Sequence, residues 1–341
     1  MVSAGSELTS NMRSLRLGLL RVVPIAIGRL VQVVSVLVAV SALTFVILSA
    51  IPGSVIDARI GPLPSFSPEE RDEIVASLTE QLGLDQPLWK QYVLWLRQVI
   101  QGDFGYTYQG LRVTDLIAQR FGPTVELGLV SVIGGLFGCL IVSLIAFRTR
   151  FRFIRGGIQG VMTLLLVMPA FWLGLILVLM IAVKFDFLPS GGFEAFGDGI
   201  VNHIKFLVLP ATTLALPLMA LFFRYLYSGL RDTENLPFIV ASRARGLSER
   251  SVVYRHILPN AILPTITVVG LVVGSLISGL VIVETVFSWP GLGSLLVKSV
   301  EVQDYGTVSA IVLITAALYV ITAFFVDVLY EIVDPRTRRR L

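Results

Sequence analysis

"LGLVSVIGGLFGCLIVSLIAF", residues 127–147, carries no charged side chain from its first residue to its last. Crossing the hydrocarbon core of a bilayer takes roughly 20 apolar residues in helical form. Backbone N–H and C=O groups find no water there, so a crossing segment must satisfy them within its own helix. The stretch therefore predicts one membrane-spanning helix, and the question is how many more accompany it.

Five further stretches have charge-free apolar centres of similar length. The helices predicted around them cover residues 30–51, 156–183, 206–226, 261–285 and 307–328. The 341-residue chain is 55% hydrophobic and only 15% charged, and its mean hydropathy is +0.83, which argues against a soluble protein. We predict an all-α integral membrane protein with six transmembrane helices.

The cations of this chain are unevenly distributed. If the N-terminus is cytoplasmic and the spans alternate, most of the 27 Lys and Arg residues fall on the cytoplasmic side, and the two short outer loops keep only Lys184, Lys205 and Lys298. This positive-inside bias predicts a multi-pass protein with both termini in the cytoplasm, a basic N-terminus at 1–29 and a basic tail at 331–341. The net charge of +4 thus reflects topology, and we expect no nucleic-acid partner.

A long extracytoplasmic segment, residues 52–123, separates the first two spans. Its first predicted helix, "SPEERDEIVASLTEQLG" (67–83), has Ser67 as N-cap and a glycine stop. A second helix follows, which lies along the outer leaflet or packs on the span bundle; its apolar face consists of Leu88, Tyr92, Trp95, Leu96 and Val99. The segment is either a simple loop with two helices or a docking platform for an external protein.

Small residues and prolines recur inside the predicted spans. Gly134 and Gly138 form a GxxxG pair, and Gly270, Gly274 and Ser278 repeat the spacing, which favours close helix packing in lipid. Kinks or helix boundaries are expected at the prolines within or beside spans, namely Pro169, Pro210 and Pro217.

The sequence lacks the motifs of several common enzyme classes. No phosphate-binding G-x-x-x-x-G-K-[ST] loop, H-E-x-x-H or G-x-S-x-G occurs, so an autonomous ATPase or a protease is disfavoured. We expect no catalytic residues, no cofactor and no metal, and the single Cys139 offers no disulfide framework. The acids nearest the spans, Glu126, Glu284 and Asp327, lie at span ends, where an ion relay through the membrane would not be built.

The longest predicted cytoplasmic stretch contains "ASRARGLSERSVVYRHILPN", residues 241–260. A short helix is predicted from about Pro237 to Gly246, where glycine permits the left-handed turn that ends it. Ser248 is a plausible cap of the next helix. Small and apolar residues alternate with the arginines, a composition that favours a protein-contact surface over a lipid-binding loop.

This stretch also resembles the EAA loop of bacterial ABC importer permeases. Ala241, Gly246 and the Leu258–Pro259 pair match its spacing, although Val240 and Ser242 replace the glutamate and the second alanine. Further blocks match in order: "LGLDQPLWKQYVLWL", "GDFG", "MPAFWLGLILVLM", "LPSGG", "VLPATTLALP", "ETVFSWPGLG" and "YEIVDP". The chain is similar to the first of the two permease subunits of dipeptide, oligopeptide or nickel ABC importers.

The resemblance implies a type I ABC importer permease fold, with the transporter domain at 124–330, in the bacterial cytoplasmic membrane. It implies no enzyme activity in this chain, since ATP is hydrolysed by separate cytoplasmic ATPase subunits. Further partners would be a second permease subunit, with which it forms a heterodimer and half of the pathway, an extracytoplasmic solute-binding protein, and membrane lipid.

The resemblance also assigns two groups of site residues. The ATPase-coupling loop would comprise Phe238, Ala241, Ser242, Arg243, Ala244, Arg245, Gly246, Leu247, Ser248, Leu258 and Pro259. An extracytoplasmic docking surface or gate would comprise Glu284, Trp289, Pro290, Gly291 and Gly293. An ion-coupled secondary transporter or channel is the alternative, and a non-transporting scaffold a third. The solute stays open among dipeptides, oligopeptides, nickel chelates, glutathione and others.

Overall fold

The structure, a computed structural model, describes residues 28, 31–50, 86–107 and 109–333. The predicted helix at 67–83 and most of the two basic termini lie outside these residues. The first described helix is Val31–Ala50. After it come α4 (Leu88–Ile100), α5 (Val113–Arg148), α6 (Arg152–Val167), α7 (Ala170–Leu177), α8 (Ile200–Glu234), α9 (Pro237–Ala244), α10 (Glu249–Val252), α11 (Leu258–Val286), α12 (Leu292–Glu301) and α13 (Tyr305–Val333).

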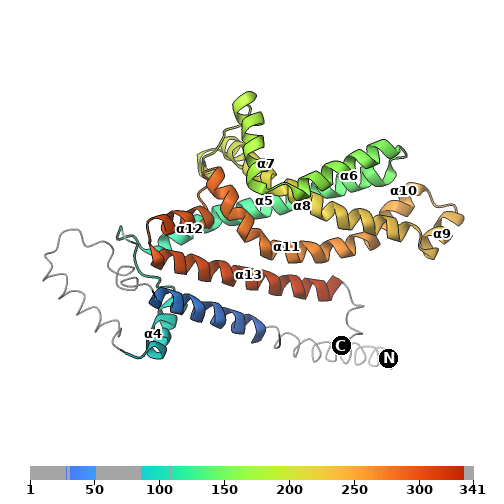
Figure 1. Cartoon of the computed structure of the whole chain (residues 1–341). Coiled ribbons are helices and arrows are strands. Elements are labelled where there is room, and N and C mark those ends of the chain that lie inside the picture. The colour runs from blue at the N-terminus through green and yellow to red at the C-terminus, as the bar shows by residue number, and fades with distance from the viewer. Residues whose placement is uncertain (1–27, 29–30, 51–85, 108, 334–341) are drawn as a thin grey trace, which may run out of the picture.

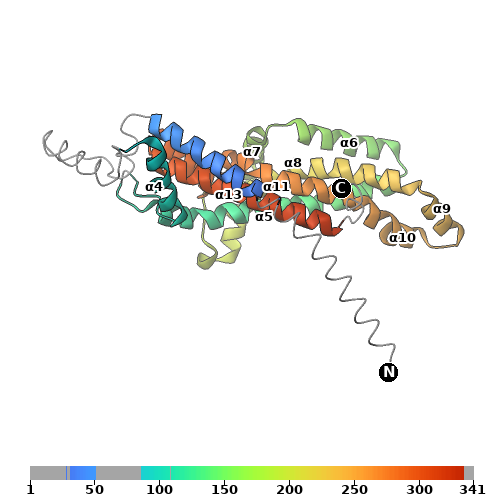
Figure 2. The same ribbon diagram turned by 90° about the horizontal axis from the view of Figure 1, so that it is seen from below.

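Four long helices, α5, α8, α11 and α13, form an elongated bundle (Figures 1 and 2). α8 lies at its centre and packs against α5 and α11, while α13 packs on the far side of α11. Within the described residues, five helices are long and apolar enough to cross a membrane, and a bent pair makes a sixth span if it is counted as one. The described residues contain no strand apart from an isolated bridge, so the predicted all-α membrane class is confirmed.

The expected continuous helix over 156–183 is divided in two. α6 ends at Val167 and α7 begins at Ala170, and their axes differ in direction by 111°. Pro169 disfavours the helical conformation in the residue before it, and Met168 accordingly has an extended backbone with ψ of 128°. Pro210 and Pro217 were expected to mark kinks or boundaries, and α8 continues through both of them, so neither is a helix boundary.

The GxxxG pair of the second span lies at the α5–α8 contact, as its spacing predicted. A Cβ atom at Gly138 would lie 2.7 Å from the sulfur of Met219, and one at Gly134 would touch Ala215. At the neighbouring Gly135 the backbone of α8 itself is close, because a Cβ atom there would lie 3.1 Å from the carbonyl oxygen of Ala215. Glycine therefore permits backbone-level contact between these helices.

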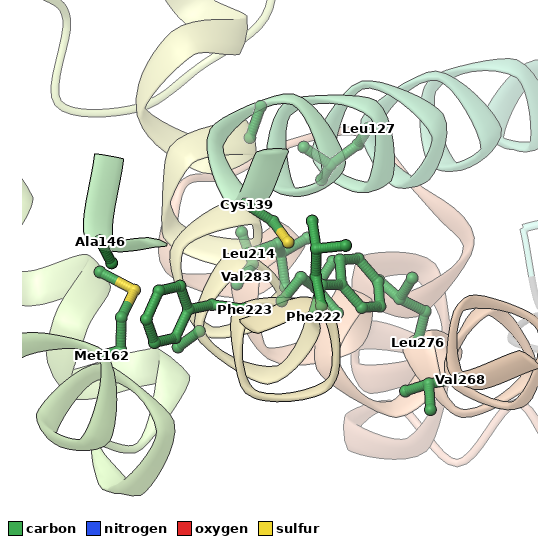
Figure 3. Packing of buried hydrophobic residues seen from close by; sticks show 14 of the residues in the cluster. Leu127, Cys139, Ala146, Met162, Leu214, Phe222, Phe223, Val268, Leu276 and Val283 are labelled. Carbon is green, nitrogen blue, oxygen red and sulfur yellow. The ribbon is translucent and has the colours of Figure 1, made fainter. Parts of the chain in front are cut away.

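Apolar side chains from α5, α6, α8 and α11 fill the centre of the bundle (Figure 3). Phe222 and Phe223 of α8 belong to one buried cluster with side chains from the other three helices, among them Leu127, Cys139, Met162, Leu276 and Val283. A second buried group, around Val113, Leu292 and Ile311, joins α5, α12 and α13. Apolar burial thus continues from the centre of the bundle to the end that carries α12.

The helix Leu88–Ile100, α4, packs on the first helix. Tyr92 shares a hydrogen bond of 2.8 Å with Ser41, and the rings of Tyr92 and Trp95 lie 5.5 and 5.6 Å from that of Phe45. The structure thereby selects packing on a span, one of the two arrangements that the sequence left open, for this face of α4.

Candidate functional site

The two predicted groups of site residues lie at opposite ends of the bundle. α9 and α10 lie at one end, and α12 with the turn before it lies at the other (Figures 1 and 2). We call residues 237–252, which comprise α9, α10 and the turn between them, the basic elbow. We call Glu284, Thr124 and the turn 291–294 the Glu284 cluster.

Local sequence explains the shape of the basic elbow. Pro237 opens α9 at a position where no intrahelical N–H is needed. Gly246, with φ of +81°, ends the helix: its N–H donates to the carbonyl of Arg243, and the N–H of Leu247 donates to that of Ser242. These two bonds define a Schellman motif, which favours glycine. Ser248 then caps α10 by accepting from the N–H of Ser251.

One face of the basic elbow is fastened to the bundle. Ile239 of α9 and Val252 of α10 are fully buried, as are Val253 and Ile257 immediately after them. These side chains join the central apolar core. Because burying such a side chain contributes roughly 1.5–3 kcal/mol, the elbow is held as part of the bundle and does not hang from it as a loose loop.

The opposite face of the basic elbow is exposed and apolar. Phe238, Val240 and Leu247 are 42%, 57% and 42% exposed, and Ala241 lies between them. Arg245 and Arg250 are also exposed beside these side chains. Of the predicted coupling residues only Ser242 is buried, where its hydroxyl donates to the carbonyl of Phe238. The elbow therefore presents a mixed apolar and cationic surface.

Arg243 differs from the other elbow arginines because it forms ion pairs with acids of this chain. Its guanidinium lies 2.6 Å from a carboxylate oxygen of Glu249 and 3.5 Å from one of Glu234, which joins α8, α9 and α10. The hydrogen bond to Glu249 raises the pKa of Arg243. The sequence had placed Arg243 in the coupling surface without indicating that two acids already hold it.

At the other end, Glu284 is fully buried. One carboxylate oxygen accepts from the hydroxyl of Thr124 at 2.7 Å, and the other accepts from the N–H of Ser294 at 3.0 Å. The Thr124 oxygen in turn accepts from the N–H of Leu292 at 2.7 Å. These hydrogen bonds connect α5, α11 and α12 and offset much of the cost of burying the carboxyl group.

The two glycines of "PGLG" are required by this arrangement. A Cβ atom at Gly291 would lie 2.0 Å from Oε1 of Glu284, and one at Gly293 would lie 2.5 Å from the Cα of Val281. Gly291 has a φ of −103°, which any residue adopts, so its small size and not its backbone freedom is what the site needs.

The turn before α12 brings distant motifs together. Ser288 has φ of +52° at the left-handed position after α11, and the N–H of Trp289 returns to the carbonyl of Glu284. The buried Trp289 donates from Nε1 to the carbonyl of Pro123 at 3.0 Å. The N–H of Gly192, from "LPSGG", donates to the carbonyl of Phe287 at 2.8 Å. Three segments far apart in the sequence thus meet here.

The residues expected to form a docking surface or gate at 284–293 are mostly buried. Glu284, Trp289, Gly291 and Gly293 are buried, and Pro290 is half-buried, because the carboxylate and the indole bond inward to α5. In this conformation they close one end of the bundle and offer little surface to another protein. Of the two predicted roles, a gate fits this geometry more directly than a docking surface does.

The other acids near span ends differ from each other. Glu126 makes an ion pair with His203, a buried side chain that the sequence analysis did not select. The side chain of Asp327 lies outside the described residues. The sequence gives no sign of Thr124, because a single threonine near a proline forms no pattern, and only the fold brings it to Glu284.

Replacing Thr124 with valine should destabilise the protein. Valine keeps the shape but removes the hydroxyl that serves both Glu284 and the N–H of Leu292. Leaving buried polar groups unpaired costs about 1–3 kcal/mol for each group. We expect a lower thermal unfolding midpoint for Thr124→Val in detergent, and nearly normal stability for Thr124→Ser. Equal midpoints for both variants would contradict a bridging role of the hydroxyl.

Two protein families match this chain along most of its length. Residues 131–339 match the family described as "Binding-protein-dependent transport system inner membrane component", and residues 22–128 match the N-terminal family of the same membrane components. Among solved structures, the fold resembles a chain of the inward-facing MetNI methionine ABC transporter, with a TM-score of 0.53 at 17% identity over 64% of this chain and 96% of that chain.

Curated relatives match along nearly the whole chain. The oligopeptide transport system permease protein AppB of Bacillus subtilis is 37% identical over 91% of this chain and 98% of its own length. The glutathione transport system permease protein GsiC of Escherichia coli (strain K12) is 34% identical over 92% and 98%. A putative peptide permease of Brucella suis is 34% identical over 91% and 97%. This chain therefore belongs to the family of inner membrane components of binding-protein-dependent transport systems.

Proposed function

We propose that this chain is one of two permease subunits of an ATP-driven importer and forms half of the path for peptides or related small solutes. A separate ATPase subunit docks on the basic elbow, and the ATPase supplies the energy. The observation that carries the proposal is the build of the elbow, which has one face buried in the bundle and the other exposed, apolar and cationic.

The fastened face of the elbow provides a route for mechanical coupling. From Glu249 the chain runs through α10, a short π-helical stretch and α11 without a helical break to Val286. A force on the exposed face of the elbow is transmitted to this continuous helical segment, because Val252, Val253 and Ile257 bury its first turns in the core. ATPase closure therefore biases the bundle between two conformations through contact alone.

The Glu284 cluster lies at the other end of the same helical segment, which runs from Glu249 to Val286. Because Glu284 belongs to the last turn of α11 and bonds to Thr124 of α5, displacement of α11 must either carry α5 with it or break these bonds. We assign the cluster the role of a gate on the extracytoplasmic side. The elbow is then cytoplasmic, as are both termini.

The relatives guide the choice of solute and partners. Those named above are permeases of oligopeptide, peptide and glutathione transport, so peptides of a few residues are the solutes proposed here. A binding protein outside the membrane delivers them, and a second, homologous permease completes the path. The ATPase activity belongs to the partner and not to this chain.

Photocrosslinking tests the contact between elbow and ATPase. A benzophenone side chain at Val240, which is 57% exposed on the elbow, should capture the ATP-binding subunit in membranes that contain the assembled importer. Val201 is the matched control: it is 64% exposed and lies in α8 at the opposite end from the elbow. Capture of lipid alone from Val240, or of the ATPase equally from both positions, would overturn the proposal.

An ion-coupled transporter is the competing function. Of the acids named above, Glu284 and Glu126 both lie near span ends and not at mid-membrane, where a relay needs a carboxylate, and Glu284 is also held by Thr124 and Ser294. Purified chain in vesicles with a proton gradient distinguishes the two functions. We expect no peptide accumulation without the ATPase subunits and ATP, whereas accumulation under the gradient alone would favour ion coupling.

A further inference from the structure

One face of α4 packs on the first helix, and another, apolar face contacts no other helix among the described residues. Tyr92 and Trp95 contact Phe45 of the first helix. Beside them, Trp89, Val93 and Ile100 are 65%, 56% and 76% exposed. Positions four, seven and eleven apart lie on one side of a helix, so these three side chains form one stripe. We call them the α4 stripe.

Cations border the α4 stripe. Lys90 and Arg97 are seven positions apart, so they lie on the same side of α4, next to the stripe and away from the face that holds Tyr92 and Trp95. The Lys90 ammonium group lies 5.6 Å from the centre of the Trp89 ring. Long basic side chains beside tryptophan and aliphatic residues are typical of helices at a membrane interface, where the cations reach lipid phosphates.

The position of α4 in the fold suits such an interface. In both views α4 runs across the direction of the long helices, at the end of the bundle that also carries α12 (Figures 1 and 2). The first helix, on which it packs, exposes Leu43, Val46 and Ile47 at 62%, 61% and 54%. Those side chains belong to a helix long and apolar enough to cross a membrane, so we expect them to face hydrocarbon. The α4 stripe belongs to the helix that packs on this span.

We propose that α4 is an interfacial anchor: its stripe enters the headgroup region of the bilayer, and Lys90 and Arg97 pair with phospholipid phosphates. Charge complementarity and continuity with the lipid-facing first helix favour a lipid over a protein as the occupant. The Tyr92–Ser41 hydrogen bond and the Phe45 ring hold α4 against the half of the first helix that leads to Ala50. This inference goes beyond the proposed function and does not depend on it.

Spin labels can locate α4 relative to the bilayer. Cys139 is the only cysteine of the chain, so a Cys139→Ala background allows single nitroxide labels at Val93→Cys, Ile100→Cys and Leu94→Cys. Leu94 is the matched control because it is apolar and 45% exposed but lies away from the stripe. The full chain is reconstituted in vesicles of phosphatidylethanolamine and phosphatidylglycerol, and its accessibility to oxygen and to a water-soluble nickel chelate is measured.

We expect labels at 93 and 100 to collide with oxygen several-fold more, relative to the nickel chelate, than the label at 94 does. Equal, high nickel accessibility at all three positions would overturn the proposal, since the stripe would then face water. Protection of 93 and 100 from both reagents would also overturn it, because protein and not lipid would cover the stripe. In each sample, a spectrum typical of a label on a helix surface establishes that α4 is folded.

Discussion

Replacing Gly246 with arginine should abolish uptake while the protein still inserts into the membrane. A Cβ atom at this position meets nothing within 4 Å, so the new side chain does not clash inside this chain. It projects instead from the turn of the basic elbow, where we place the contact with the ATPase. An unpaired charge buried in an interface costs several kcal/mol, and each 1.4 kcal/mol weakens binding about tenfold.

The backbone contribution must be separated from this effect. Gly246 has φ of +81°, where a residue with a side chain is strained by roughly 1–2 kcal/mol. Gly246→Asn is the matched control, because asparagine tolerates the left-handed conformation and adds no charge. We expect the asparagine variant to retain most of the uptake. Uptake by the arginine variant should fall to the background level that is measured in membranes without ATP.

Three measurements make this prediction decisive. Uptake of a labelled peptide by the assembled importer, the amount of permease in the membrane, and crosslinking from Val240 to the ATPase are compared for wild type and both variants. For Gly246→Arg we expect both the uptake and the crosslink to be lost, while the amount of permease in the membrane stays normal. Uptake that survives Gly246→Arg would count against the elbow as the site of coupling.

The sequence predicted the elbow well because its signals are local. Proline at the first turn of α9, glycine at Gly246 and serine at Ser248 each act within a few residues, and all three lie where the pattern placed them. The spans were predictable for a similar reason, since a long charge-free run admits only a helix in lipid. The ends of these helices were less predictable, because α5 and α8 extend well beyond the apolar runs.

What the sequence did not predict depends on contacts between distant residues. Pro169 divides a helix whereas Pro210 and Pro217 do not, although each interrupts an apolar run. The burial of Glu284 was equally hidden, because its partners Thr124 and Ser294 come from α5 and α12. Acidic side chains near the ends of membrane spans are ordinarily exposed to water, so only the fold shows that Glu284 is buried.

Replacing Gly291 with alanine should impair folding severely. The added methyl carbon would lie 2.0 Å from one oxygen and 2.1 Å from the carboxyl carbon of Glu284, a side chain that is itself fully buried. The carboxyl group cannot move without losing its bonds to Thr124 and Ser294. Overpacking of this kind costs about 1–3 kcal/mol, and unpaired buried groups add about 1–3 kcal/mol each. Gly122→Ala, where a Cβ atom meets nothing within 4 Å, is the matched control.

A second substitution identifies the cause of that defect. If the methyl group harms the protein because it strikes the carboxylate, removing the carboxylate should relieve it, so Glu284→Ala combined with Gly291→Ala should be more stable than Gly291→Ala alone. The backbone at Gly291, with φ of −103°, suits alanine, so no strain remains in the double variant. Thermal unfolding midpoints of the two single variants and the double variant in detergent give the coupling directly. Additive losses would mean that Gly291 serves something other than the space that Glu284 occupies.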